Sequence, residues 1–229
     1  MTKKIMICGG GSGGHIFPGI AACHALAERN IAFEWLGCAG GMEEQLIPAS
    51  GIKLHLVQFE KPGGGIGATA RALLKAKDAA KEAAGYISDS GANAVLGMGG
   101  YPSLPGVLAA VSMKLPRLIH EQNAKLGWAN LALIKLTNRA MVTYPDTTSN
   151  YAYRTGLPLR PEFANVPPPE QRFAGRSGGL RILVLGGSQG ASSLNTKVPA
   201  ALAGMDTRPE RIVHQAGAGK AGEATAAYE

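Results

Sequence analysis

The stretch that decides the fold reads IMICGGGSGGHIFPG and covers residues 5–19. A short apolar run, residues 5–8, ends at a glycine-rich loop, residues 9–14, and the sequence after the loop has the apolar spacing of a helix up to residue 29. Pro18 stands near the start of that helix, where proline is tolerated. The stretch therefore predicts a buried strand, a tight loop and a helix, in that order.

The same unit returns along the chain with variations. Further strands are expected at residues 33–36, 94–96, 117–120 and 140–143, and further helices at residues 103–112 and 127–136. Alternating strands and helices predict an α/β fold, in which helices cover both faces of a parallel sheet. Ligands of such sheets bind at the carboxyl ends of the strands, so the loops that follow the strands are the candidate sites.

The sequence also predicts two domains. Residues 1–160 hold enough alternating elements for a complete Rossmann-like domain, and residues 161–178 form a linker rich in proline and glycine. The opening pattern then returns as LRILVLGGSQGA over residues 180–191, followed by a helix to about residue 202 and a strand at residues 211–214. Two strands cannot close a doubly wound sheet, so residues 179–229 are expected to be the truncated start of a second Rossmann-like domain.

Composition fixes the broad class of protein. The chain has 229 residues, of which 45% are hydrophobic and 17% charged, as in globular domains. Its apolar runs are too short for a membrane span, and its amino terminus lacks the apolar stretch of a signal peptide, so a cytosolic protein is expected. Cys8, Cys23 and Cys38 are odd in number and lack CxxC spacing, which argues against a disulfide framework or a zinc site.

The charge of the chain lies mainly in its first part. Residues 1–160 carry 16 Lys and Arg against 10 Asp and Glu, a net charge of +6, whereas residues 161–229 carry 7 against 6, a net charge of +1. An anionic partner should therefore meet the first domain. Phosphates, anionic lipid and nucleic acid all fit this description, and composition does not choose among them.

The motifs that the sequence lacks exclude several functions for the glycine loops. Gly9, Gly11 and Gly14 fit the GxGxxG pattern, but the first acids after the second strand, Glu43 and Glu44, come too late to hold the ribose of NAD. A dehydrogenase is therefore the weaker alternative. No GxxxxGK[ST] and no DxD occur, which argues against a P-loop nucleoside triphosphatase and a metal-dependent sugar transferase. Glycine loops on two domains favour a metal-independent nucleotide-sugar transferase, in which helix ends and basic side chains stabilise the leaving diphosphate.

Five motifs make the interpretation specific. They are GGSGGHIFPG at residues 10–19, GMGGY at 97–101, HEQN at 120–123, PLR at 158–160 and GGSQGA at 186–191. Together they closely resemble the MurG family of bacterial GT-B glycosyltransferases, and the resemblance runs in order from residue 3 to the end of the chain. It implies an inverting enzyme without metal or cofactor that moves N-acetylglucosamine from UDP-GlcNAc to the muramyl 4-hydroxyl of lipid I. The product, lipid II, serves peptidoglycan synthesis and so cell shape and division.

The resemblance also implies a role for single residues. Those that match donor-binding positions are Ser12, Gly13, Gly14, Asn123, Arg160, Ser188 and Gln189. The acceptor pyrophosphate is expected at Gly13, Gly14, Gly99, Gly100 and Tyr101. His15 is the candidate base that takes the proton of the attacking hydroxyl, because histidine titrates in the suitable range. Glu121 is the second candidate, as a base or as an orienting partner.

The implied partners are UDP-GlcNAc, lipid I and an anionic membrane surface, with other cell-wall enzymes as further candidates and no nucleic acid. Arg71, Lys75, Lys77 and Lys81 stand in an expected helix over residues 66–84, which would suit peripheral binding at the cytoplasmic face of the bacterial inner membrane. The family's second domain continues beyond residue 229, so the 229-residue chain is expected to transfer sugar poorly. The rival hypothesis is a noncatalytic Rossmann-like protein that binds lipid surfaces or nucleic acid through its basic half.

Overall fold

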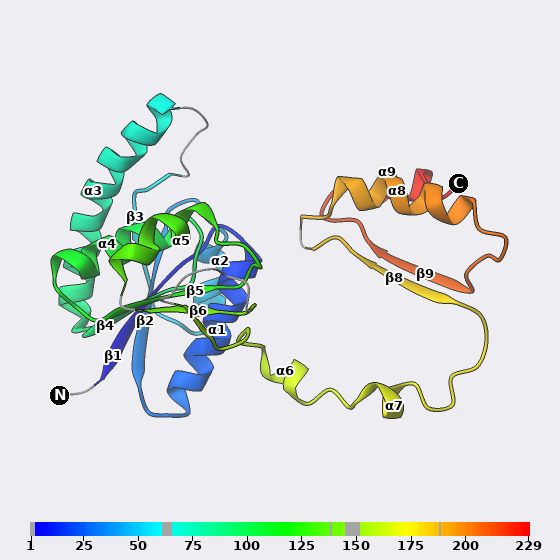
Figure 1. Cartoon of the computed structure of the whole chain (residues 1–229), viewed down its shortest axis with the longest axis horizontal. Coiled ribbons are helices and arrows are strands. Elements are labelled where there is room, and N and C mark those ends of the chain that lie inside the picture. Colours follow the sequence, from blue (N-terminus) through cyan, green and yellow to red (C-terminus); the bar gives the residue numbers. More distant parts are fainter. Residues whose placement is uncertain (1–2, 61–65, 138, 145–151, 188) are drawn as a thin grey trace. The chain divides into compact units, whose positions relative to one another are not determined.

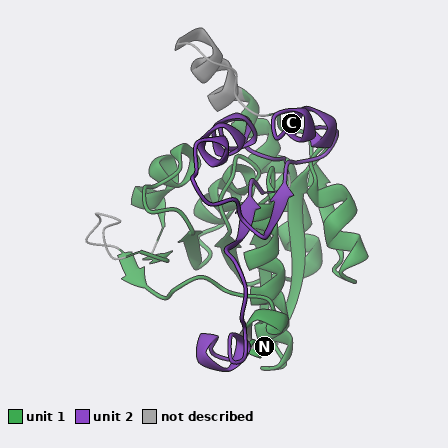
Figure 2. Ribbon diagram, turned by 90° about the vertical axis from the view of Figure 1, so that its right-hand side faces the viewer, with its two compact units in different colours: residues 1–166 green, residues 167–229 purple. Residues whose placement is uncertain are grey.

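A computed structural model describes residues 3–60, 66–137, 139–144, 152–187 and 189–229. The chain divides into two compact units, residues 1–166 and residues 167–229, which Figure 2 draws in green and purple. Side chains at residues 66–74 and 164 are not described. In the described part of the chain, no helix has both the length and the apolar character needed to cross a membrane.

The first unit is built on a seven-stranded parallel sheet, in the order β3-β2-β1-β4-β5-β6-β7. Its strands are β1 (Lys4–Cys8), β2 (Ala32–Cys38), β3 (Leu54–Val57), β4 (Ala94–Gly97), β5 (Arg117–Glu121), β6 (Arg139–Val142) and β7 (Ala152–Arg154). The predicted α/β class with a parallel sheet is confirmed. Successive strands are added on one side of β1 and then, from β4 onward, on its other side. The carboxyl ends of β1 and β4 therefore form the switch point at which ligands of such sheets bind.

Helices cover both faces of this sheet (Figure 1). One face carries α1 (Gly13–Ala27) and α2 (Glu43–Ala49), and the other carries α3 (Ile66–Ser90), α4 (Ser103–Ser112) and α5 (Trp128–Leu133), with a 3-10 turn at Ile134–Leu136. A further short helix, α6 (Pro161–Ala164), begins with proline at its first position, as the fixed φ of proline favours.

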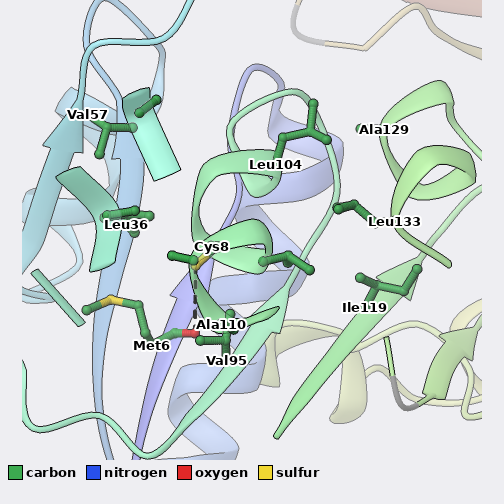
Figure 3. Packing of buried hydrophobic residues seen from close by; sticks show 14 of the residues in the cluster. Met6, Cys8, Leu36, Val57, Val95, Leu104, Ala110, Ile119, Ala129 and Leu133 are labelled. Atoms are coloured by element: carbon green, nitrogen blue, oxygen red, sulfur yellow. Dashed lines mark hydrogen bonds between the residues drawn. The ribbon is translucent and has the colours of Figure 1, made fainter. Parts of the chain in front are cut away.

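The alternation of side chains along the strands divides the core in two. Met6 and Cys8 of β1 point into the cluster beneath α3 and α4, which Figure 3 shows. Ile7, between them in the sequence, points into the opposite cluster with Trp35 of β2. At Gly106 of α4, an added Cβ would lie 2.2 Å from Cys8 Sγ, so α4 packs directly on β1.

The second unit is a smaller parallel arrangement. It contains α7 (Pro169–Arg172), β8 (Arg181–Leu185), α8 (Ser192–Ala203), β9 (Arg211–Gln215) and α9 (Ala221–Ala226). β8 and β9 pair in parallel register from Arg181 opposite Arg211 to Leu185 opposite Gln215. Leu183 and Leu185 remain 63% and 62% exposed, because α8 and α9 lie on the other face of these strands.

Several elements were not expected from the sequence. α2, β3 and β7 are short, and their apolar patterns are too brief to stand out from loops. Residue type alone predicts Trp35, Trp128 and Met98 in the core. Trp35 and Met98 are buried, whereas the side chain of Trp128 on α5 is 49% exposed, so this prediction is wrong for Trp128.

Glu34 of β2 is a buried acid in the sheet. Burial of Glu34 opposes its ionisation, but hydrogen bonds from His55, Lys4 and Lys53 outweigh this and lower the pKa of Glu34 to about 2. The folded state therefore binds this proton less readily than the unfolded chain, whose pKa lies near 4.5. Glu34 should stabilise the fold above pH 4.5, and its contribution should disappear as the pH falls from 4.5 toward 2.

Chemical denaturation of the wild-type chain and Glu34→Gln at several pH values measures this contribution. The difference in unfolding free energy between the two proteins should be largest near neutral pH and shrink below pH 4.5. Glu28→Gln, at an exposed position beside the end of α1, is the control and should follow the wild-type curve. A difference that does not change with pH would contradict the assignment.

Candidate functional site

The candidate site lies where β1, β4 and β5 end. The loop after β1 ends at Ser12, the N-cap of α1, and Gly13, Gly14 and His15 lie in the first turn of that helix. The loop after β4 holds residues 99–101, and the turn after β5 begins at Glu121. The structure thus brings together predicted residues from three segments, the first of which lies more than 80 positions before the other two in the sequence.

Two side chains hold the first glycine loop in place. Trp35 of β2, fully buried, donates a hydrogen bond from Nε1 to the carbonyl oxygen of Gly9 over 3.0 Å. Glu43 of α2 accepts a hydrogen bond from the N–H of Gly11 at 2.9 Å and another from the N–H of Cys38 at 3.1 Å. The loop is therefore fixed at its beginning and in its middle, before α1 starts.

Glu43 is completely buried, and glycines make room for it. A Cβ added at Gly10 would lie 2.2 Å from its carboxylate, one at Gly41 would lie 2.4 Å from Cδ, and one at Gly37 would lie 2.6 Å from Cγ. The sequence pattern brings Glu43 into question only as a ribose ligand and does not indicate this role. The signal that could have found it is an acid in the first turn of a helix directly after Gly40 and Gly41.

The amino end of α1 offers free hydrogen-bond donors. Ser12 stands at the N-cap with extended backbone, and the described part of the chain provides no side-chain hydrogen bond to cap the helix. The first N–H groups that bond within the helix are those of His15 and Ile16, both to the carbonyl oxygen of Ser12. The N–H groups of Gly13 and Gly14 are left for a ligand, at the positive end of the helix dipole.

The loop after β4 packs against the first loop. Gly99 and Gly100 have φ angles of 90° and 74°, which favour glycine. A Cβ at Gly99 would lie 2.7 Å from His15 Nδ1, and one at Gly100 would lie 2.3 Å from the carbonyl oxygen of Gly10. Only glycines let these two loops meet with the His15 ring between them. Tyr101 lies on the same side, since a Cβ at Gly11 would meet its ring at 3.1 Å.

The environment of His15 keeps its imidazole neutral. Burial lowers the pKa of His15, and the opposing contributions of the Met98 carbonyl, Glu121, Gln122 and Glu43 do not reverse this direction. Its Nδ1 lies 3.2 Å from the carbonyl oxygen of Met98. A neutral imidazole at this position can accept a proton at neutral pH.

Glu121 uses both of its oxygens within the protein. Oε1 accepts hydrogen bonds from the backbone and side-chain nitrogens of Asn123, each at 2.9 Å. Oε2 accepts from the N–H of Gly127 at 2.8 Å and from Asn130 Nδ2 at 3.0 Å. These four hydrogen bonds fit an orienting residue better than a base, because a base needs an oxygen that faces the proton it takes.

Arg160 lies near the start of α1. Its guanidinium carbon is 5.2 Å from the ring centre of Phe17 and 5.1 Å from that of Phe163. Stacking on two aromatic rings fixes the direction of a long side chain and leaves its N–H groups available to an anion. The contact with Phe17 ties the end of the first unit to the helix that follows the glycine loop.

The second unit repeats the strand, loop and helix at β8 and α8. Gly190 has a φ of 67°, and a Cβ there would lie 1.8 Å from the carbonyl oxygen of Ala216, so the loop packs tightly on the end of β9. The carbonyl oxygen of Gln189 accepts a hydrogen bond from Lys220 Nζ at 3.0 Å. The side chain of Gln189 is exposed and takes no part in this bond. Ser188 lies outside the described residues.

The chain is similar to known proteins along most of its length. Residues 5–142 match the glycosyltransferase family 28 N-terminal domain. The chain is 42% identical over 228 residues to the UDP-N-acetylglucosamine--N-acetylmuramyl-(pentapeptide) pyrophosphoryl-undecaprenol N-acetylglucosamine transferase of Mannheimia succiniciproducens, covering 99% of this chain and 64% of that protein. The transferase of the same name from Burkholderia pseudomallei is 42% identical over 219 residues, covering 94% of this chain and 59% of that protein.

A solved structure shows the same fold. The crystal structure of Acinetobacter baumannii MurG superposes with a TM-score of 0.72 at 28% identity, covering 99% of this chain and 62% of that one. The chain therefore spans a little under two thirds of the length of the relatives it matches. The expected GT-B type of fold is confirmed by this neighbour.

We expect Glu43→Gln to destabilise the first unit by about 1–3 kcal/mol, because the substituted amide presents an N–H₂ group to one of the two backbone donors. Chemical denaturation measures the loss, and faster amide hydrogen exchange at Gly11 should report the loosened loop. Glu44→Gln is the matched control, since Glu44 is the exposed neighbour on the same helix and should change stability by less than about 0.5 kcal/mol. Equal stability of both variants would show that the loop does not depend on Glu43.

Proposed function

Because the chain belongs to glycosyltransferase family 28, whose N-terminal domain it matches over residues 5–142, we propose that it acts in the transfer of N-acetylglucosamine from UDP-GlcNAc to lipid I. The name of the relative from Mannheimia succiniciproducens states this donor and a muramyl-pentapeptide acceptor on pyrophosphoryl-undecaprenol. The observation that carries the proposal is the meeting of two glycine loops around His15, beside the free amino end of α1.

The first unit is proposed to bind the acceptor. The N–H groups of Gly13 and Gly14 at the start of α1 make no hydrogen bond with the described residues, and they suit a pyrophosphate because both donors and dipole favour negative charge. Gly99, Gly100 and Tyr101 form the second wall of the same site. The glycines serve two purposes there, since they allow the loops to touch and they let a large anion approach the backbone.

Asn123 and Arg160 of the first unit are proposed to bind the donor. Asn123 donates a hydrogen bond to Glu121 through Nδ2. Its side-chain oxygen takes no part in that bond and can accept a hydrogen bond from a nucleotide sugar. Arg160 can neutralise the diphosphate with a guanidinium that aromatic rings already hold in place. Ser12 offers a hydroxyl at the loop, and Ser188 and Gln189 are proposed for the loop of the second unit.

The reaction proposed is a direct displacement at the anomeric carbon. His15 takes the proton of the muramyl 4-hydroxyl while that oxygen forms the new glycosidic bond and the bond to the diphosphate of UDP breaks. Glu121 holds the turn after β5 in position through its four hydrogen bonds. No metal is required in this scheme, since helix ends and Arg160 receive the charge of the leaving group.

The acceptor's lipid tail implies that the first unit works at a membrane surface. We place the contact at α3, whose Lys75, Lys77 and Lys81 are exposed and can meet anionic headgroups. Arg71 stands one turn earlier, among the residues whose side chains are not described. The location proposed is peripheral, at the cytoplasmic face of the inner membrane, where other cell-wall enzymes are candidate partners.

Calorimetric binding of a soluble, short-chain lipid I analogue to the 229-residue chain tests the acceptor site. Gly14→Ala should weaken binding about tenfold or more, equivalent to about 1.4 kcal/mol, because a methyl group would stand between the helix end and the pyrophosphate. The fold accepts this change, since a Cβ at Gly14 lies no closer than 3.7 Å to Ser12 Oγ. Gly85→Ala, on α3 with nothing within 4 Å of the added Cβ, is the control.

Three outcomes would refute the acceptor site. They are no binding by the folded chain, binding that does not need the pyrophosphate, and equal binding by wild type and Gly14→Ala. A basic surface binder without a site would show the second of these, with affinity that falls steeply with salt whatever the headgroup.

We expect the 229-residue chain to transfer sugar slowly or not at all, because its second unit has a sheet of only two described strands and the relatives are longer. Incorporation of labelled N-acetylglucosamine into the lipid I analogue measures this rate. The transferase of Mannheimia succiniciproducens, assayed beside it, supplies the reference. A comparable rate for the two proteins would show that the described residues suffice for donor binding.

A further inference from the structure

His15 Nδ1 is in contact with two groups, one of which requires a proton on Nδ1 and the other a bare lone pair. The carbonyl oxygen of Met98, 3.2 Å away, can only accept a hydrogen bond, so Nδ1 must carry a proton to bond with it. The side-chain amide of Gln122 presents its nitrogen to the same atom. That nitrogen can only donate, so a protonated Nδ1 leaves it without an acceptor.

The other end of the Gln122 amide is also unsatisfied. Its Oε1 is buried and has no hydrogen-bond partner among the described residues. A buried acceptor without a donor costs about 1–3 kcal/mol in general. An amide nitrogen and oxygen have nearly the same size, and a half-turn about the Cγ–Cδ bond exchanges them without moving other atoms. After this turn, Oε1 accepts a hydrogen bond from Nδ1–H, so the conflict at His15 disappears, and the amide nitrogen takes the former place of Oε1.

We infer that Gln122 is a positioning residue, whose amide oxygen shares the Nδ1 proton of His15 with the Met98 carbonyl and so leaves Nε2 bare. The inference rests on the proposed function in one respect, which is that His15 serves as the base there. With Nδ1 protonated, the lone pair on Nε2 is the one that receives the proton of the attacking hydroxyl. The resulting imidazolium keeps both Nδ1 acceptors, so no group has to turn during the reaction.

The position of Gln122 is itself fixed by its neighbours. It lies between Glu121, whose two oxygens accept four hydrogen bonds, and Asn123, which gives two of them. The backbone at residue 122 therefore has little freedom, and its half-buried side chain reaches His15 across 107 positions of sequence. Glu121 thus acts on the histidine through the turn that it holds.

A neutral partner suits this histidine better than a carboxylate would. The charged groups that face His15 are Glu121 of β5 and Glu43 of α2, and both raise its pKa, but burial lowers it further than they raise it. An amide oxygen fixes the tautomer without adding a third negative charge. The imidazole consequently stays unprotonated at neutral pH, as a base requires.

Long-range ¹H–¹⁵N NMR spectra of the 229-residue chain test the inference directly, because the two imidazole tautomers give different patterns. The signals of His15 are assigned by their loss in His15→Ala. We expect wild-type His15 to be the Nδ1–H tautomer at pH 7.5. In Gln122→Met, the ratio of Nδ1–H to Nε2–H should fall about fivefold, the equivalent of one hydrogen bond.

The control is Gln45→Met, an exposed position on α2 that should leave the His15 signals unchanged. A wild-type His15 in the Nε2–H form would overturn the inference, and this holds even where the Gln122 variant fails to fold. An unchanged ratio in folded Gln122→Met would also overturn it, since the Met98 carbonyl alone would then set the tautomer. Neither result depends on the lipid I analogue, so failure here is distinct from failure of the proposed function.

Discussion

The carboxylate of Glu43 sets the shape of the edge at which β1 and β2 end. A buried charge costs several kcal/mol unless hydrogen-bond donors surround it, and here the N–H groups of Gly11 and Cys38 supply them. The space for the carboxylate exists because residues 10, 37 and 41 are glycines. One acid thus accounts for three glycines, of which residues 10 and 41 lie in loops and residue 37 lies in β2. The conformation of the first glycine loop, and with it the direction of α1, depends on this contact.

Glu121 applies the same principle at the end of β5. Its oxygens collect the donors of a turn and of the start of α5, as those of Glu43 collect the donors of two loops. Each carboxylate accepts hydrogen bonds from backbone or amide N–H groups with both of its oxygens, so neither suits proton transfer. What they provide is rigidity: the loop after β1 and the turn after β5 are both held, and His15 lies between them in contact with Gln122. Such fixed geometry reduces the reorganisation that a reaction requires.

The sequence predicted what is encoded locally. The strand, loop and helix over residues 5–29 follow from a short apolar run, a block of glycines and helical spacing, and the structure places β1 and α1 there. Glu43 was missed because its partners Gly11 and Cys38 lie on two separate loops, which no spacing rule connects. The contact of Gln122 with His15 spans 107 positions and depends on how β1, β4 and β5 lie side by side. Trp128 was misplaced because a short helix packs only one face, and the sequence does not say which.

Two acids beside a histidine would ordinarily hold it protonated, and an anionic ligand would be repelled by them. Here both effects are suppressed by the same arrangement. The carboxylates of Glu43 and Glu121 accept hydrogen bonds from backbone N–H groups, so the dipoles of the loops balance their negative charge. Burial then decides the pKa of His15, in the downward direction. The outer side of the site is left to the amino end of α1 and to Arg160, which are positive. An edge built on two buried acids can therefore present positive groups to an anion and keep the imidazole of His15 neutral.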